Sequence, residues 1–202
     1  KNLTLQDFMD VEYILLETTD EFIIKGKVAD VGKNILILTN MRQGEILIFD
    51  RSTGKGLKKI NRRGQGPEEY ILPFNVHLNK EENEIFVNDG PSSKILVYDL
   101  EGNYKKTILY KKGALVTNLY DYDDRHFLSQ NVYAPENESS TSTFFLLSKE
   151  DGSWTDIEVP YRKRISPVIM KRVADRVYAS VPGNSFISSY QDNWILSEPS
   201  AD

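Results

Sequence analysis

The chain has 202 residues, of which 40% are hydrophobic and 27% are charged, as is ordinary for a globular protein. Its formal net charge of −5 argues against binding of nucleic acid or of an anionic membrane surface through bulk electrostatics. The sequence contains no cysteine, which excludes disulfides, cysteine–metal sites and a cysteine nucleophile. No run of 18 apolar residues predicts a membrane span, and the first residues contain no signal-peptide core.

Short apolar runs bounded by turn residues predict a chain made mostly of β-strands. The first run is Val11–Glu17, and a repeated pattern of strands, polar loops and Asp–Gly turns follows it. No long window has helical periodicity, and the segment 168–181 fits either a strand or a short helix. The strands predicted in the repeats are Val28–Val31, Ile35–Leu38, Ile46–Phe49, Asn75–Leu78, Ile85–Val87, Ile95–Tyr98, Tyr104–Leu109, Leu115–Leu119, Phe127–Ser129, Phe144–Leu147 and Trp154–Val159, and a last pass begins at Ser185.

Equivalent positions of the pattern recur at a spacing of 49 to 51 residues. Ile46 and Ile95 are 49 positions apart, and Gly102 and Gly152 are 50 apart. A period of this length with four short strands per repeat is typical of propeller blades. We therefore predict an all-β fold, a β-propeller of four-stranded antiparallel blades, in one domain that holds about three and a half blades. The expected blades span roughly residues 22–70, 71–113, 114–166 and, incomplete, 167–202.

Several of the predicted strands are apolar at every position, for example ILIL, ILIF and ILVY. A sheet with one face in water would alternate apolar and polar residues. Blades pack face to face, so their inner strands are covered on both sides. These runs are accordingly predicted to form the core and to carry no function of their own.

The stretch IFVNDGPSSKILVYDLEG resembles the NHL-like repeat, with its strand, Asp, polar loop, strand, Asp and Gly. Together with VEYILLETTDE, ILIFDRSTGKGLKKINRRGQGPEEY and DNWILSEPSAD, it makes the chain similar over nearly its whole length to a six-bladed β-propeller family of bacterial proteins. Those proteins are mostly exported, are often lipoproteins and have no agreed biochemical activity. The resemblance implies an extracytoplasmic location, in the periplasm or at the cell surface, and a lipid anchor outside this chain.

The resemblance also implies a longer protein. Six blades of about 50 residues need about 300 residues. We therefore expect the 202 residues to be part of a longer chain, in which Val11–Glu17 completes the last blade and closes the ring. Two alternatives are closure by a second copy of the chain and a smaller, irregular sheet fold.

Three basic pairs lie in the loops that link the predicted blades: Arg62 with Arg63, Lys111 with Lys112, and Arg162 with Lys163. They recur at spacings of 49 and 51 residues, so the fold is expected to bring them to one face. A ring of cations on one face could bind an acidic glycan or a phosphate group. The alternative is a solvated rim whose cations pair with nearby acids such as Glu68 and Glu69.

Other candidate sites depend on single residues. Tyr133, like Tyr120 and Tyr122, lies near the long polar loop 134–142, where an aromatic ring could stack on a sugar; packing between blades is the alternative. Gly64, Gly66 and Pro67 are expected to shape the turn between blades, because glycine tolerates positive φ and proline stiffens the exit. They are not expected to cradle phosphate, because no helix follows them. The two histidines, His77 and His126, have no metal-ligand spacing, so no metal or cofactor is predicted.

No catalytic motif is recognisable in the sequence. The leading hypothesis is therefore a non-enzymatic binding or interaction module that recognises a glycan or a protein partner through its loop face. Two other functions stay open, a polysaccharide hydrolase or lyase on a propeller scaffold and a structural scaffold of a cell-envelope assembly. The predicted ligand-binding residues are Arg62, Arg63, Lys111, Lys112, Arg162, Lys163 and Tyr133.

Overall fold

The computed structural model describes residues 4, 9–79, 83–114, 116–131, 144–158, 169–173, 176–180, 186–190 and 193–197. In these ranges the regular structure is β-strand apart from one 3₁₀ turn, η2 (Gly90–Ser92). No helix in the described part of the chain is long and apolar enough to cross a membrane. The prediction of an all-β fold is confirmed.

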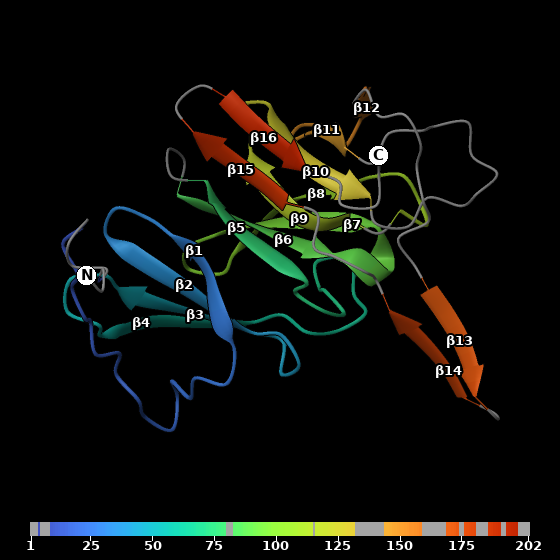
Figure 1. Cartoon of the computed structure of the whole chain (residues 1–202). Helices are drawn as coiled ribbons and strands as arrows, with labels where there is room; N and C mark the ends of the chain where they lie inside the picture. The colour runs from blue at the N-terminus through green and yellow to red at the C-terminus, as the bar shows by residue number, and fades with distance from the viewer. Residues whose placement is uncertain are drawn as a thin grey trace.

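Three four-stranded antiparallel sheets account for most of the described residues, and in each sheet consecutive strands are neighbours (Figure 1). Sheet I contains β1 (Lys27–Val31), β2 (Ile35–Asn40), β3 (Glu45–Asp50) and β4 (Gly56–Asn61); sheet II contains β5 (Asn75–Asn79), β6 (Glu84–Asp89), β7 (Lys94–Asp99) and β8 (Tyr104–Leu109); sheet III contains β9 (Val116–Asp121), β10 (His126–Asn131), β11 (Phe144–Ser148) and β12 (Trp154–Ile157). These are the four-stranded antiparallel units that the 50-residue repeat predicts.

Two further hairpins follow, in the part of the chain predicted as one incomplete blade. β13 (Ile169–Val173) pairs with β14 (Arg176–Ser180), and β15 (Phe186–Tyr190) pairs with β16 (Asn193–Ser197). The segment 168–181, which fitted strand or helix, therefore forms strands where it is described. The β15–β16 hairpin packs on sheet III, because Ile187 lies in one apolar cluster with Leu128 and Phe144.

The core lies between neighbouring sheets. Side chains of β3 and β7 are buried along almost their whole length, in agreement with their continuous apolar sequences. One apolar cluster joins sheets I and II and includes Ile37, Leu78 and Tyr98, whereas a second joins sheets II and III through residues such as Phe86 and Phe127. Burial of this many large apolar side chains is the main favourable term in the stability of the fold.

The first strands of the three sheets lie next to one another. β1 contacts β5, and β5 contacts β9, although more than 35 residues separate the two strands of each pair in the sequence. In Figure 1 the sheets spread outward from this row of first strands. Any polar side chain on the first strands is therefore brought close to those of the neighbouring sheets.

An Asp–Gly turn joins the third and fourth strands of each sheet. In sheet I the Oδ1 atom of Asp50 accepts hydrogen bonds from the backbone N–H groups of Ser52 and Thr53 at 3.0 and 2.7 Å. Gly54 then takes a φ of +72°, which a residue with a side chain rarely adopts. Gly102 and Gly152 repeat this conformation with φ of +83° and +74°, as their spacing predicts.

These turn glycines also mark close contacts between sheets. A Cβ atom on Gly152 would lie 2.0 Å from the backbone oxygen of Leu109, in the last strand of sheet II. A Cβ atom on Gly54 would lie 2.0 Å from the backbone oxygen of Leu15. The backbone at Leu15 therefore lies against the Asp–Gly turn of sheet I as β8 lies against the Asp–Gly turn of sheet III.

The strand predicted at Val11–Glu17 is not formed. One ladder-like hydrogen bond joins the Glu17 N–H to the carbonyl oxygen of Gly54 at 2.8 Å, and the described residues provide no strand for it to pair with. A strand needs a hydrogen-bonded neighbour, so the apolar pattern alone does not produce one. Tyr13 and Leu15 remain 87% and 90% exposed.

Candidate functional site

A hollow lies at the row of first strands. It consists of two contiguous cavities of about 340 and 680 Å³, which share the lining residues Lys27, Thr39, Phe74 and Asn118. The smaller cavity extends along the first strands, and the larger one opens toward the β2–β3 turn. Cavities of this size are within the range that binds small ligands or short stretches of a polymer.

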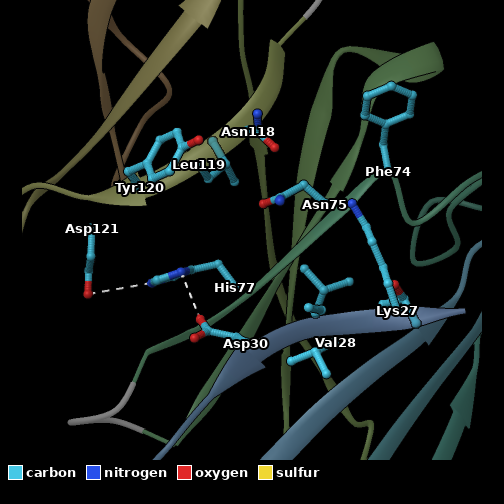
Figure 2. A pocket seen from close by; sticks show the side chains of 13 residues that line it. Lys27, Val28, Asp30, Phe74, Asn75, His77, Asn118, Leu119, Tyr120 and Asp121 are labelled. Carbon is cyan, nitrogen blue, oxygen red and sulfur yellow. Dashed lines mark ion pairs between the residues drawn. The ribbon is translucent and has the colours of Figure 1, made fainter. Parts of the chain in front are cut away.

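Each sheet places an amide or ammonium group in the smaller cavity. Lys27 stands at the beginning of β1, Asn75 at the beginning of β5, and Asn118 within β9. Side chains alternate between the faces of a strand, so polar residues at these positions are presented on the side away from the apolar core. Figure 2 shows Lys27, Asn75 and Asn118 converging from the three strands.

The floor of the same cavity is a chain of charged groups. His77 on β5 lies between Asp30 of β1 and Asp121 of β9 (Figure 2). Its Nδ1 is 3.0 Å from Oδ2 of Asp30, which also accepts the Leu78 N–H at 2.9 Å. Its Nε2 is 3.5 Å from Oδ2 of Asp121, which is an electrostatic contact longer than a good hydrogen bond.

Lys149, in the turn between β11 and β12, completes this chain. Its ammonium group donates to Asp121 Oδ1 and, at 2.7 Å, to the backbone oxygen of Asp123. The same group lies 4.8 Å from the centre of the Phe127 ring, a cation–π distance. The two aspartates are thus balanced by a histidine and a lysine across three sheets.

These neighbours shift the pKa values of the cluster. Burial acts to lower the pKa of His77, but the carboxylates of Asp121 and Asp30 outweigh it and raise the pKa above 6.5. Burial acts to raise the pKa of Asp121, whereas His77 and Lys149 lower it to about 2. The pKa of Asp30 is also lowered, because the bonds from His77 and the Leu78 N–H outweigh burial. The two carboxylates therefore favour the protonated form of the histidine between them.

Two buried side-chain atoms of the cavity have no hydrogen-bond partner among the described residues: Oδ1 of Asn75 and Nε2 of His77, and of these Oδ1 is the acceptor. A buried polar atom without a hydrogen bond costs on the order of 1 to 3 kcal/mol, so such atoms usually meet water or a ligand. Asn75 stands where a ligand in the smaller cavity would touch it. The amide is therefore a candidate for accepting a hydroxyl or amino group.

Three cations surround the opening: Lys25, Lys27 and Arg42, which line the larger cavity. All three are exposed, and no described carboxylate forms an ion pair with them. The backbone beside them is fixed, because the Lys25 N–H donates to the Asn40 side chain at 2.8 Å. The hollow thus has a basic rim above a charge-balanced floor. No group of three or more His, Asp and Glu side chains in the described ranges is placed to hold a metal ion.

The first basic pair of the predicted cation ring is bonded to backbone carbonyls. The Arg62 guanidinium donates to the Gly102 oxygen from Nε and Nη2 at 3.2 and 2.9 Å, which joins sheet I to sheet II. Arg63 donates from Nη1 to the backbone oxygen of Arg42 at 2.7 Å. Neither forms the expected ion pair with Glu68 or Glu69 among the described contacts; their part in ligand binding stays a prediction.

The other predicted site residues lie elsewhere or outside the described residues. Lys111 stands over the Trp154 ring at 5.8 Å, and its neighbour Lys112 is exposed. Arg162, Lys163 and Tyr133 lie outside the described residues, so the structure does not place them.

Tyr120 and Tyr122, the companions of Tyr133 in the sugar-stacking hypothesis, both meet Trp194 of β16. The ring of Tyr122 stacks on Trp194 with centroids 6.0 Å apart, and Tyr120 meets it edge-on at 6.4 Å. Tyr120 also lines the smaller cavity. Packing between sheet III and the last hairpin accounts for both rings.

The loop at residues 62–70 is shaped by Glu69 and Tyr70. The Glu69 carboxylate accepts the Gly66 N–H at 2.9 Å, and a Cβ atom on Gly64 would lie 1.8 Å from the same oxygen. Neither glycine takes a positive φ; Gly64 instead lies against the Glu69 carboxylate, which would have to move if position 64 carried a side chain. The buried Tyr70 hydroxyl donates to the Gly44 oxygen at 2.9 Å and accepts the Arg62 N–H at 3.1 Å.

Sequence reasoning missed the hollow. His77 was set aside because it has no metal-ligand spacing, and Asp30 and Asp121 were not considered. A signal was present: the first strand of each repeat carries polar residues within an apolar run, as in Asn75-Val-His77 and Asn118-Leu-Tyr-Asp121. On a strand that contacts a neighbouring sheet on each side, polar side chains need hydrogen-bond or charge partners, and polar residues of the adjacent first strands can provide them.

Comparison with known proteins identifies the family. A family model, Domain of unknown function (DUF4934), matches residues 1–202. The chain belongs to the DUF4934 family. No curated protein matches it.

Two solved structures similar to this DUF4934 chain come from Bacteroides species. A predicted exported protein of Bacteroides fragilis NCTC 9343 has a TM-score of 0.69 and 16% identity, and the match covers 98% of this chain and 57% of that one. A member of the DUF4221 family from Bacteroides vulgatus ATCC 8482 has a TM-score of 0.53 and 14% identity, over 76% of this chain and 45% of that one. At these identities the similarity extends to the fold alone, and the DUF4934 chain spans little more than half the length of the first structure.

Proposed function

We propose that this DUF4934 chain is a non-enzymatic glycan-binding module whose site is the hollow at the first strands. The observation that carries the proposal is the convergence of Lys27, Asn75 and Asn118 from three sheets on one cavity, with an unpartnered amide oxygen inside it. Amide, hydroxyl and ammonium groups match sugar hydroxyls, and the Phe74 ring at the edge offers an apolar face. Binding sites of this kind favour loops and strand ends on a rigid scaffold.

We further propose that the three sheets are blades of a six-bladed propeller with NHL-like repeats. The support is the equivalence of Gly54 and Gly152: residue Leu15 contacts sheet I as Leu109 of an outer strand contacts sheet III. Leu15 then belongs to the outermost strand of a blade that precedes sheet I in the ring. The first strands would line the centre of that ring, and the hollow would open there.

The side chain of Ile14 tests the ring. Ile14 lies against Gly54 as Ile108 lies against Gly152, and Ile108 is buried, whereas Ile14 is half-buried in this chain. Ile14→Asp, made in the full-length protein, should then lower the free energy of unfolding by more than about 1 kcal/mol. A change within about 0.5 kcal/mol would mean that no blade covers this segment.

An extracytoplasmic location, by way of a lipid anchor, fits a protein that binds glycans outside the cell. The support is the similarity in fold to a predicted exported protein. Fractionation of cells, with detection of the protein in envelope and soluble fractions, tests it.

A panel of glycans tests the binding function. Thermal unfolding of the protein is followed with neutral and acidic oligosaccharides; a ligand at 100 times its Kd adds about 2.7 kcal/mol of stability. The shift should disappear in Asn75→Ala and persist in Asn103→Ala, a control in the exposed β7–β8 turn. No shift with any glycan would favour a protein partner, and new reducing ends or unsaturated products would instead indicate a hydrolase or lyase.

A further inference from the structure

The cations at the rim of the hollow differ from three lysines of sheets I and II that form ion pairs. Lys59 pairs with Glu45 at 2.8 Å, Lys58 with Glu101 at 3.0 Å and Lys105 with Glu84 at 2.6 Å. Lys25, Lys27 and Arg42 form no such ion pair in the described part of the chain, although the charge of Lys25 helps to lower the pKa of the Glu45 carboxylate. A set of positive charges without ion-pair partners around a cavity raises the local concentration of anions.

The floor of the hollow does not cancel this effect. It carries the carboxylates of Asp30 and Asp121, but each faces His77, and Asp121 also holds the Lys149 ammonium. When His77 is protonated, two negative groups therefore meet two positive ones within the cluster. The potential at the opening is set by the three rim cations, which face an incoming ligand first.

The lining favours an anion that also carries hydroxyl groups. A simple anion such as phosphate needs only cations, whereas the smaller cavity adds the unpartnered Asn75 oxygen, which accepts a hydrogen bond. The Asn118 amide and the Phe74 ring lie beside it, one polar and one apolar. In Figure 2 the Lys27 side chain extends from β1 toward Asn75 and Phe74, so one ligand could meet all three.

We propose, resting on the glycan-binding function above, that the hollow binds acidic sugar residues, with the ligand anion held by Lys25, Lys27 and Arg42 and its hydroxyl by Asn75. The anion is a carboxylate of a uronic acid or a sulfate ester, since both suit ammonium and guanidinium donors. The sugar hydroxyl supplies the donor that the Asn75 oxygen lacks. Selectivity for charge therefore comes from the rim and selectivity for sugar from the cavity.

Matched ligand pairs test the proposal by isothermal titration calorimetry. Oligogalacturonate is compared with its methyl ester, and dextran sulfate with dextran, at 50 and 500 mM NaCl. The charged member of at least one pair should bind ten times more tightly or better at 50 mM, and the advantage should shrink at 500 mM because salt screens exposed charges. The pair that shows the effect distinguishes carboxylate from sulfate.

Variants locate the binding. The double variant Lys25→Gln/Lys27→Gln should lower the affinity for the charged ligand at least tenfold. Arg42→Gln should lower this affinity by a smaller factor. The control Lys33→Gln/Lys55→Gln removes the same charge from exposed lysines that do not line the hollow, and should change the affinity less than twofold. Circular dichroism checks that each variant is folded.

The outcomes separate this inference from the glycan-binding function. Equal binding of charged and neutral sugars, or equal loss in the rim and control variants, would overturn acid selectivity and leave glycan binding standing. Absence of binding to every sugar would overturn both. Neutral-sugar binding that Asn75→Ala removes would keep the cavity as the site and eliminate the role of the rim.

Discussion

Two groups of basic side chains, Arg62 with Arg63 and Lys25 with Lys27, differ in the groups that they contact. Arg62 and Arg63 are held by backbone carbonyls of Gly102 and Arg42, so they join one segment to another. Lys25 and Lys27 line a cavity and form no ion pair among the described residues. The first group belongs to basic pairs that recur with the repeat, and the second does not. We therefore expect the basic residues that recur with the repeat to stabilise contacts between repeats, and those that do not recur to be available for a ligand.

The largest effect should come from the residue that anchors the first group. Tyr70 is fully buried and ties the loop at residues 62–70 to Gly44 and Arg62. Tyr70→Ala should lower the free energy of unfolding by about 3 to 5 kcal/mol, because it leaves a large cavity and removes two hydrogen bonds. Denaturation with urea measures it.

Two further variants separate packing from hydrogen bonding at this position. Tyr70→Phe keeps the ring and should cost about 1 to 2 kcal/mol. Tyr13→Phe, which loses the same hydroxyl from an exposed side chain, should cost nothing measurable. Equal stability of Tyr70→Ala and the unmodified protein would show that the loop is not anchored as described.

Two substitutions, one in each group of basic residues, separate an effect on stability from an effect on ligand affinity. Arg62→Gln removes the bonds to Gly102 and should lower the free energy of unfolding by about 1 kcal/mol while leaving glycan affinity unchanged. Lys27→Gln should change stability by less than about 0.5 kcal/mol but weaken an acidic ligand. Urea denaturation and calorimetry on both variants give the four values. If Arg62→Gln lost affinity instead, the recurring basic pairs would be the binding site.

The charged floor of the hollow predicts how stability depends on pH. The pKa of His77 is raised on folding, so its contribution is complete below pH 6.5 and is lost as the pH rises through the folded value. The pKa of Asp121 falls to about 2 from 3.8, so its contribution is present above pH 3.8 and is lost on acidification. Stability should therefore be greatest between about pH 4 and 6.5.

His77→Gln tests the origin of the alkaline loss. The variant should be less stable at pH 6 and should lose less stability between pH 6.5 and 9, since no imidazolium remains to deprotonate. His126→Gln, which changes a histidine near the surface, should keep the alkaline loss of the unmodified protein. Urea denaturation across this pH range measures both. Parallel curves for His77→Gln and the unmodified protein would assign the loss to another group.

The sequence predicted much of the fold because the strands and turns of each repeat can be recognised from short local segments. Continuous runs such as ILVY are buried strands, and the Asp–Gly turns recur where their spacing places them. The segment Val11–Glu17 forms no strand in this chain, because a strand also depends on a neighbour that the segment's own residues do not encode. The hollow depends on residues such as Asp30, His77 and Asp121, which are more than 40 positions apart and meet only when three first strands align.

The smallest effect should come from Lys112, a member of a recurring pair that sits in the exposed turn before β9. Lys112→Gln should leave the free energy of unfolding within about 0.5 kcal/mol, as is usual for an exposed side chain. It should lower the affinity for an acidic glycan less than about twofold, because salt at physiological concentration screens a charge that does not contact the ligand. Calorimetry at 150 mM NaCl, beside Lys27→Gln, gives the ratio of the two losses. A larger loss for Lys112→Gln than for Lys27→Gln would place the ligand on the outer ring of basic pairs, and the rule that repetition marks structure would fail for this protein.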